Sequence, residues 1–346
     1  MIFFGKRLVG VVCAASAVCL FSQPAHAIVA GNPNPPTGAD GLSLYPADSP
    51  NNPYNPVTQT GHLDMLGLAS PFSGVGQIDQ GTGTLLDSTH VLTAAHLFRN
   101  GSDPTGISFN LDSGTGTMSF AASRIDICPQ FRGVVDNDAG DLAIVTLSTP
   151  VPATFRTYSL YTGALTSGTT LTLVGYGESG NGVTGYSGGA GVRRVGKNNA
   201  DAALLPGGGD NNVDPTLQPG NQTYLFDFDS PDGDTASAPN VLGGTSLGND
   251  VETTLGNGDS GGPGFILVGG QYEIAALNNF LVRFGPDSNL GPNIPLFGSG
   301  GGGPIVSGYT SFLAGFVPAP EPAPWAALGL GGLLLAGRMG LHRRKN

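Results

Sequence analysis

The chain has 346 residues, 57 of them glycine, with 14 Lys and Arg against 25 Asp and Glu. Setting aside the two terminal segments described below, residues 28–319 keep 8 basic and 24 acidic side chains, a net charge of about −16. Nucleic acid and anionic membrane surfaces are poor partners for a surface of this charge, and no nucleic-acid partner is expected. The glycine content and the short apolar runs favour a loop-rich all-β domain and argue against long helices.

The N-terminal segment predicts export. Two basic residues precede an apolar stretch over residues 8–21, and Ala25-His26-Ala27 then supplies a cleavage site with small residues. The stretch is too short for a membrane-spanning helix, so residues 1–27 are interpreted as a secretory signal peptide. After its removal Cys128 is the only cysteine between residues 28 and 346, and no internal disulfide can form.

Three separate motifs predict nucleophilic catalysis. Thr93-Ala94-Ala95-His96 offers a base, Asp141 precedes an apolar strand-like run, and Gly258-Asp259-Ser260-Gly261-Gly262-Pro263 places a serine between glycines. A serine on such a tight turn can attack a carbonyl while a backbone N–H faces the developing oxyanion. The chain order is His, Asp, Ser, with intervals of 45 and 119 residues. The alternative, a G-x-S-x-G α/β-hydrolase, requires acid and histidine after the serine, where only His342 remains.

These motifs in this order resemble the trypsin-like (chymotrypsin-fold) serine proteases. Val174-Gly175-Tyr176-Gly177 is similar to a strand end of that family, and Ser307-Gly308-Tyr309-Thr310 to its last strand. The resemblance covers residues 28–316, interrupted by divergent loops such as 32–58. It implies two antiparallel six-stranded β-barrels with the active site in the cleft between them.

The resemblance also implies roles for particular residues. His96, Asp141 and Ser260 would form the catalytic triad, and the N–H groups of Gly258 and Ser260 the oxyanion hole. Thr254 falls at the pocket floor and Phe280 at its wall. Because position 254 carries no acid, a preference for Arg or Lys is not supported, although the nearby Glu252 keeps that question open.

Cleavage after Ala27 would expose Ile28-Val29-Ala30-Gly31, which resembles the activated terminus of the family. There the new α-amino group pairs with the acid before the nucleophile, here Asp259, and orders the oxyanion loop. Signal peptidase would then activate the enzyme directly. The alternative is that Ile28 merely begins a strand.

Acidic residues gather in one glycine-containing loop, at Asp227, Asp229, Asp232 and Asp234. Alternating carboxylates are ligands that Ca²⁺ prefers, so this loop is a Ca²⁺ candidate. The run lacks the EF-hand spacing, and a solvated acidic loop is the alternative. No cofactor is otherwise expected.

The composition changes again in residues 317–346. Pro320-Glu321-Pro322 precedes an uncharged apolar run over residues 325–337, and a basic end follows. This arrangement resembles a PEP-CTERM sorting signal, which an exosortase recognises in Gram-negative bacteria. An ordinary single-pass anchor is the alternative, although the run is short for a hydrocarbon core of about 30 Å.

The sequence therefore predicts an exported serine endopeptidase that acts on protein or peptide substrates. Its expected location is the outer envelope, cell surface or extracellular matrix, after a transient stage anchored in the inner membrane. Signal peptidase and exosortase are the expected processing partners. The alternative is a catalytically weak surface or matrix protein that keeps the protease fold for binding.

Overall fold

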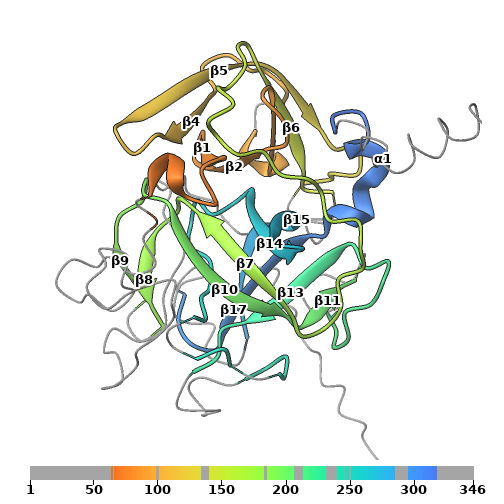
Figure 1. Cartoon of the computed structure of the whole chain (residues 1–346). Helices are drawn as coiled ribbons and strands as arrows, with labels where there is room; N and C mark the ends of the chain where they lie inside the picture. The colour runs from red at the N-terminus through yellow and green to blue at the C-terminus, as the bar shows by residue number, and fades with distance from the viewer. Residues whose placement is uncertain are drawn as a thin grey trace, which may run out of the picture.

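The computed structural model is an all-β protein in which the chain builds one half and then the other (Figure 1). Strands β1 to β6 occupy the upper part of that view, and the strands from β7 onward fill the lower part. The structure describes residues 64, 66–98, 101–133, 140–182, 185–205, 213–230, 240–244, 246–248, 251–284 and 295–317.

The first half is a closed barrel in which the strand order is β1-β2-β3-β6-β5-β4. All its pairings are antiparallel. The ring therefore leaves no free edge in this half. The six strands are β1 (Val75–Ile78), β2 (Gly81–Leu85), β3 (His90–Thr93), β4 (Ser108–Asp112), β5 (Thr117–Ile127) and β6 (Ala143–Leu147).

Alternating burial explains how these strands close around a core. In β4 the buried residues are Phe109 and Leu111, while their neighbours are only half-buried, as expected for a strand with one inward face. The two side chains join Val91, Val145 and other apolar residues inside the ring. Their burial supplies the main favourable free energy for closing the barrel.

The second half contains two larger sheets and a small hairpin. One sheet has the strand order β10-β7-β14-β15, the other has the order β12-β11-β13-β17-β16, and β8 pairs with β9. The first sheet consists of β7 (Thr169–Gly175), β10 (Arg194–Ala200), β14 (Gly262–Val268) and β15 (Gln271–Asn278). The others are β8 (Ser179–Asn181), β9 (Gly185–Gly188), β11 (Ala202–Leu204), β12 (Val213–Asp214), β13 (Thr223–Asp227), β16 (Phe280–Arg283) and β17 (Ser299–Pro304).

The all-β prediction is confirmed, and the first of the two expected barrels is present. In the described part of the second half, the isolated bridge Ala276↔Ile305 connects β15 to the residue that follows β17. Closure of a second six-stranded barrel therefore stays a prediction.

A large apolar cluster joins the two halves. It brings Leu92 and Ile144 of the first barrel together with Val174, Phe265 and other residues of the second half. Because these side chains are fully buried at the junction, separating the halves would expose a continuous apolar surface to water. The junction therefore fixes how the catalytic motifs of the two halves face one another.

The C-terminal segment of the described chain returns to the first barrel (Figure 1). The expectation of a last strand at Ser307–Thr310 was wrong: these residues belong to the 3₁₀ helix η4 (Val306–Tyr309) and the start of α1 (Thr310–Leu313). The last strand is β17. Tyr309, Leu313 and Phe316 pack against the junction cluster at roughly helical spacing, which explains the helical backbone.

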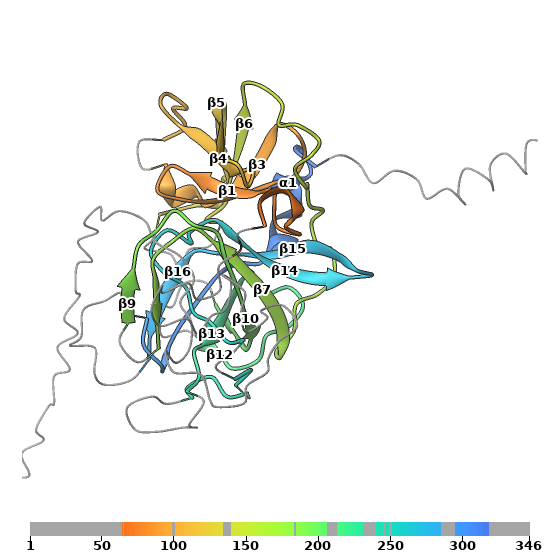
Figure 2. The same ribbon diagram turned by 60° about the vertical axis from the view of Figure 1, so that its left-hand side comes forward.

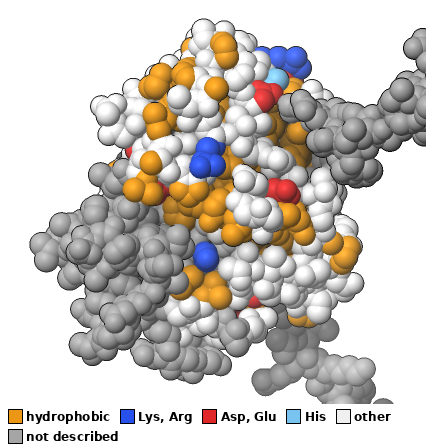
Figure 3. Space-filling view, viewed as in Figure 1, with side chains coloured by type: hydrophobic (Ala, Val, Ile, Leu, Met, Phe, Trp, Pro, Cys, Tyr) orange, Lys and Arg blue, Asp and Glu red, His pale blue; other side chains and the backbone are white. Residues whose placement is uncertain are grey.

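Among the described residues, no helix is long and apolar enough to span a membrane. The remaining short helices are 3₁₀ turns, η1 (Gly67–Ala69) and η2 (Ala95–Leu97). In Figure 2 the β14–β15 hairpin projects from the body of the second half, and Leu267 near its tip is 59% exposed. In the space-filling view, apolar side chains gather over the middle of one face and charged ones are scattered (Figure 3).

Candidate active site

The pairing of β3 with β6 brings His96 and Asp141 together. Thr93, the last residue of β3, lies opposite Ala143, the first residue of β6. His96 follows this pair within the turn η2, and Asp141 precedes it by two residues. Residues 45 positions apart in the sequence therefore meet at one end of the first barrel.

Asp141 contacts His96 through both carboxylate oxygens. Oδ1 accepts a hydrogen bond from the His96 backbone N–H at 2.8 Å, and Oδ2 lies 2.6 Å from Nδ1. The Asp141 side chain is fully buried, whereas the His96 ring is 19% exposed. An ionised carboxylate only accepts hydrogen bonds, so Nδ1 carries the ring proton and Nε2 keeps its lone pair. The arrangement suits His96 to act as a general base.

The backbone around Asp141 is held from the second half. Asn279 Nδ2 donates to the Asp141 carbonyl at 2.7 Å, and the Gly140 N–H donates to Tyr309 Oη at 2.8 Å. Neither side chain was singled out from the sequence for this role, because no local motif links it to the histidine or the aspartate.

Ser260 lies on the turn that leads into β14. Gly258 and Gly261 have φ values of +97° and +81°, in the left-handed region that favours glycine. A side chain on Gly261 would lie about 2.5 Å from the Thr82 carbonyl oxygen and 2.6 Å from the Ala94 nitrogen. The turn thus packs against the segment just before His96.

Thr82 of β2 ties the Ser260 turn to the first barrel. Its N–H donates to the Ser260 carbonyl at 2.8 Å, and its hydroxyl donates to the Gly258 carbonyl at 2.9 Å. Within the described part of the chain, the N–H groups of Gly258 and Ser260 donate no hydrogen bond. Two such free donors on one turn suit an oxyanion.

Asp259 is fully buried behind this turn. Its oxygens accept hydrogen bonds from the Gly177 N–H at 3.0 Å and the Gly256 N–H at 2.7 Å. Burial lowers the pKa of the nearby Arg194, and the charge of Asp259 opposes that shift. Ile28, the expected partner of Asp259, lies outside the described residues, so that ion pair stays a prediction.

Thr254 and Phe280 occupy different surroundings. Thr254 is fully buried, and its Oγ1 has no hydrogen-bond partner among the described residues. Phe280 packs against a small cluster containing Leu225, whereas Leu281 packs against the cluster that contains Leu255, the neighbour of Thr254. Leu281 was not singled out from the sequence.

The acidic loop is partly described. Asp227 and Asp229 are buried with Asp201 and Glu252 nearby, while Asp232 and Asp234 lie outside the described residues. Asp227 Oδ2 accepts hydrogen bonds from the N–H groups of residues 241 and 242. Across the described ranges, no group of three or more His, Cys, Asp or Glu residues is arranged to hold a metal ion.

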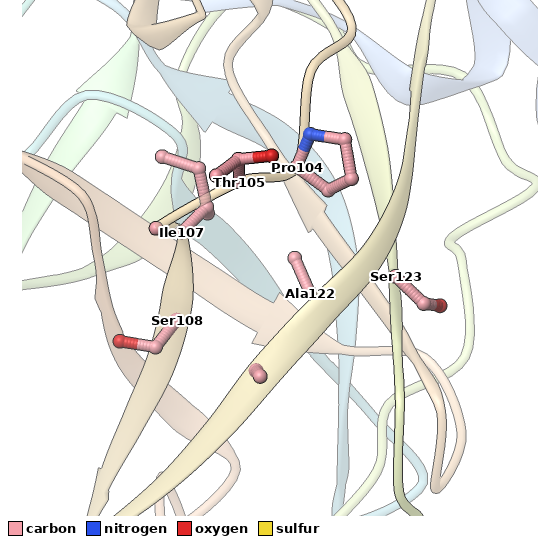
Figure 4. A pocket seen from close by; sticks show the side chains of 8 residues that line it. Pro104, Thr105, Ile107, Ser108, Ala122 and Ser123 are labelled. Carbon is pink, nitrogen blue, oxygen red and sulfur yellow. The ribbon is translucent and has the colours of Figure 1, made fainter.

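A shallow groove of about 330 Å³ lies elsewhere on the first barrel, between residues 104–108 and residues 121–123 (Figure 4). Its lining consists of Pro, Thr, Gly, Ile, Ser and Ala, and it contains no titratable side chain. It offers none of the groups needed for acid–base or nucleophilic chemistry.

The fold and the His–Asp pair define a chymotrypsin-like all-β scaffold. A family model described as Trypsin matches residues 62–196, a range that contains His96 and Asp141 and ends before Ser260. No curated protein matches the chain. The family match and the closed barrel support a trypsin-like serine protease, a class that acts on protein or peptide substrates.

Proposed function

We propose that the protein is an exported serine endopeptidase in which Ser260 is the nucleophile, His96 the general base and Asp141 the group that orients His96. The observation that carries this proposal is the double contact of Asp141 with His96, next to a glycine-rich serine turn. It gives the imidazole the tautomer that a serine nucleophile requires.

The proposed reaction has two halves. Ser260 Oγ attacks the peptide carbonyl while its proton passes to His96 Nε2, and the carbonyl oxygen becomes an oxyanion facing the N–H groups of Gly258 and Ser260. The intermediate then collapses, the C–N bond breaks, and the imidazolium returns the proton to the leaving amine. Water attacks the resulting acyl-enzyme with the same general base and releases the acid and free Ser260.

The finer assignments are further proposals. Thr254 and Phe280 would contribute to the substrate pocket, and the α-amino group of Ile28 would pair with Asp259 after signal peptidase cleavage. Ca²⁺ would bind the acidic loop that contains Asp227, Asp229, Asp232 and Asp234. Export would follow from residues 1–27, and an exosortase would process the tail beyond residue 317.

A fluorophosphonate tests the assembled site, because it phosphonylates only an activated serine. The full chain should incorporate about one equivalent, and Ser260→Ala and His96→Ala should abolish incorporation. A folded wild-type protein that stays unlabelled would favour the alternative, a protease-fold binding protein without catalysis.

A further inference from the structure

The described second half contacts the backbone on both sides of the Asp141 side chain. On one side Tyr309 Oη accepts the Gly140 N–H at 2.8 Å, and on the other Asn279 Nδ2 donates to the Asp141 carbonyl at 2.7 Å. Asn279 directly follows β15, and Tyr309 ends η4. Two side chains that are 30 positions apart in the sequence thus bind the adjacent residues Gly140 and Asp141 of the first half.

The backbone at Asp141 needs such anchors because strand pairing does not yet hold it. Gly140 has a φ of +73°, and the Leu142 N–H donates back to the Gly140 carbonyl at 2.7 Å, which makes a tight turn. The β3–β6 ladder begins only at Ala143. The position of the Asp141 carboxylate therefore depends on how this turn is fixed from outside the strand.

Asn279 is suited to fix it. The residue is 7% exposed, and its own N–H donates to the Gly302 carbonyl of β17 at 2.8 Å. Its Oδ1 is buried without a hydrogen-bond partner among the described residues. A buried amide oxygen of this kind lowers stability. An apolar side chain of similar size would avoid this cost, whereas the carboxamide supplies the bond to Asp141.

We propose that Asn279 and Tyr309 are positioning residues that hold Asp141 in register with His96, and so couple docking of the second half to assembly of the catalytic site. This inference rests on the proposed function, because it assigns Asp141 to the triad. Neither side chain touches the reacting atoms. Both act through the backbone of residues 140 and 141.

The described titratable groups that face this turn are few. His96 contacts the carboxylate, and the Cys128 thiol and the Tyr309 phenol lie within electrostatic reach of Asp141. Burial raises the pKa of Tyr309 to about 12 and also raises that of Cys128. Both groups are therefore neutral near pH 7, so neither contributes to the acidic limb of the pH profile, which reports on the general base His96.

The test compares kcat, KM and pH profiles of the full chain with those of Asn279→Ala, Asn279→Asp and Tyr309→Phe. Asn279→Ala should lower kcat by about 10–10²-fold with KM unchanged, because a misplaced catalytic group slows chemistry more than binding. The acidic limb should move to lower pH, since a displaced carboxylate stabilises the imidazolium less. Tyr309→Phe keeps the ring but removes the hydroxyl, and it should also shift the acidic limb of the pH profile to lower pH.

Asn279→Asp gives a signature that a merely structural role would not. Its protonated carboxyl can still donate to the Asp141 carbonyl, whereas its ionised form repels that oxygen. Activity should therefore fall with rising pH along a titration that wild type and Asn279→Ala lack. Asn278→Ala is the matched control: this buried neighbour bonds to Pro263 and Tyr224 instead, so it should lower Tm and leave the limb in place.

Two failures are distinguishable. If the fluorophosphonate does not label wild-type Ser260, the proposed function falls and this inference falls with it. If wild type is labelled but Asn279→Ala and Tyr309→Phe both keep the wild-type acidic limb and kcat, only the positioning role is overturned. Should Asn279→Ala not fold, Tyr309→Phe and Asn279→Asp decide between the same two results.

Discussion

At the residue scale, the tautomer of His96 depends on a single acceptor. Asp141 Oδ2 lies 2.6 Å from Nδ1, and Oδ1 binds the His96 backbone, so the ring and its main chain are fixed by one buried carboxylate. An amide in its place can present its NH₂ group to Nδ1 and stabilise the opposite tautomer.

Asp141→Asn should therefore lower kcat by about 10⁴-fold, with a small effect on KM. The cause is a proton on Nε2, where the serine proton would have to go. Steady-state kinetics on a peptide ester, together with Tm and circular dichroism to verify folding, make the measurement. A loss below about 10-fold in a folded variant would contradict the assigned role of Asp141.

The residues of the candidate triad could be predicted from sequence because each lies in a local motif. The residues that hold them could not. Thr82, Asn279 and Tyr309 act through pairings over 138 to 178 positions, and nothing in their own neighbourhoods marks these contacts. Such long-range hydrogen bonds depend on how the two halves dock, which local patterns do not specify.

At the element scale, buried carboxylates hold the segments that lead to the Ser260 turn. Asp227 accepts two backbone N–H groups from residues 241 and 242, and Glu252 accepts the Asp229 N–H at 2.6 Å and the Ser246 hydroxyl at 2.7 Å. Burial raises the pKa of Asp201 to about 8, and the negative charges of Asp227, Asp229 and Glu252 act in the same direction.

This cluster should make stability fall as the pH rises. In the unfolded chain Asp201 releases its proton near pH 3.8, but in the folded protein it keeps the proton up to about pH 8. Between these values the folded state binds more protons, so raising the pH through this window favours unfolding. Asp201→Asn, which stays neutral, should remove that part of the pH dependence.

The measurement is Tm from pH 5 to pH 8 for wild type and Asp201→Asn. The quantity to compare is the Tm of Asp201→Asn minus the Tm of wild type at the same pH. This difference should be at least about 2–4 °C larger at pH 8 than at pH 5. A change of about 1 kcal/mol shifts Tm by this amount in a domain of this size. Asp214→Asn serves as the control, because Asp214 is a half-buried residue of β12 whose carboxylate bonds to Thr216 outside this cluster. If the Tm of wild type and the Tm of Asp201→Asn change equally between pH 5 and pH 8, Asp201 does not cause the predicted loss of stability.

Strand positions were largely predictable and the C-terminal turn was not. The apolar runs at 142–147 and 171–176 form β6 and β7 nearly as expected, because both are rich in β-branched and other apolar residues and are almost continuously buried. Ser307–Thr310 is helical instead. Its conformation is decided by packing of Tyr309 and Leu313 onto the junction cluster, which overrides local β propensity.

At the scale of the whole molecule, a buried ion pair joins the start of the first barrel to the second half. Arg193, just before β10, is fully buried, and its Nε lies 2.9 Å from Asp64 Oδ2. The Asp64 N–H donates to the Arg193 carbonyl at 2.9 Å, and Ser70 also donates to the carboxylate. The pair supports the apolar junction cluster in fixing the two halves.

Arg193→Met should lower the free energy of unfolding by about 3–5 kcal/mol, because Asp64 is left buried without its cation. Adding Asp64→Asn should recover part of that loss. Urea unfolding measures the free energy of unfolding of the single and the double variant. Arg124→Met is the control, because the Arg124 side chain is 67% exposed. Its pair with Asp126 should contribute less than about 1 kcal/mol. Equal losses for Arg193→Met and Arg124→Met would show that the buried pair is dispensable.

The architecture was predictable to the level of an all-β fold with a closed first barrel, through the family resemblance. Closure of the second half is not decided by sequence, because the 118 residues between Asp141 and Ser260 include long loops and place β7 to β13 between the two motifs. The order of strands in those sheets comes from non-local pairing, which no single segment encodes.

The account depends most on an acyl-enzyme at Ser260, and a pre-steady-state burst tests it most directly. When the full chain is mixed with an activated p-nitrophenyl ester, it should release about one equivalent of nitrophenol in a burst, and mass spectrometry should find the acyl group on Ser260. Absence of a burst from folded wild-type protein, or an acyl group that forms equally in Ser260→Ala, would contradict the account.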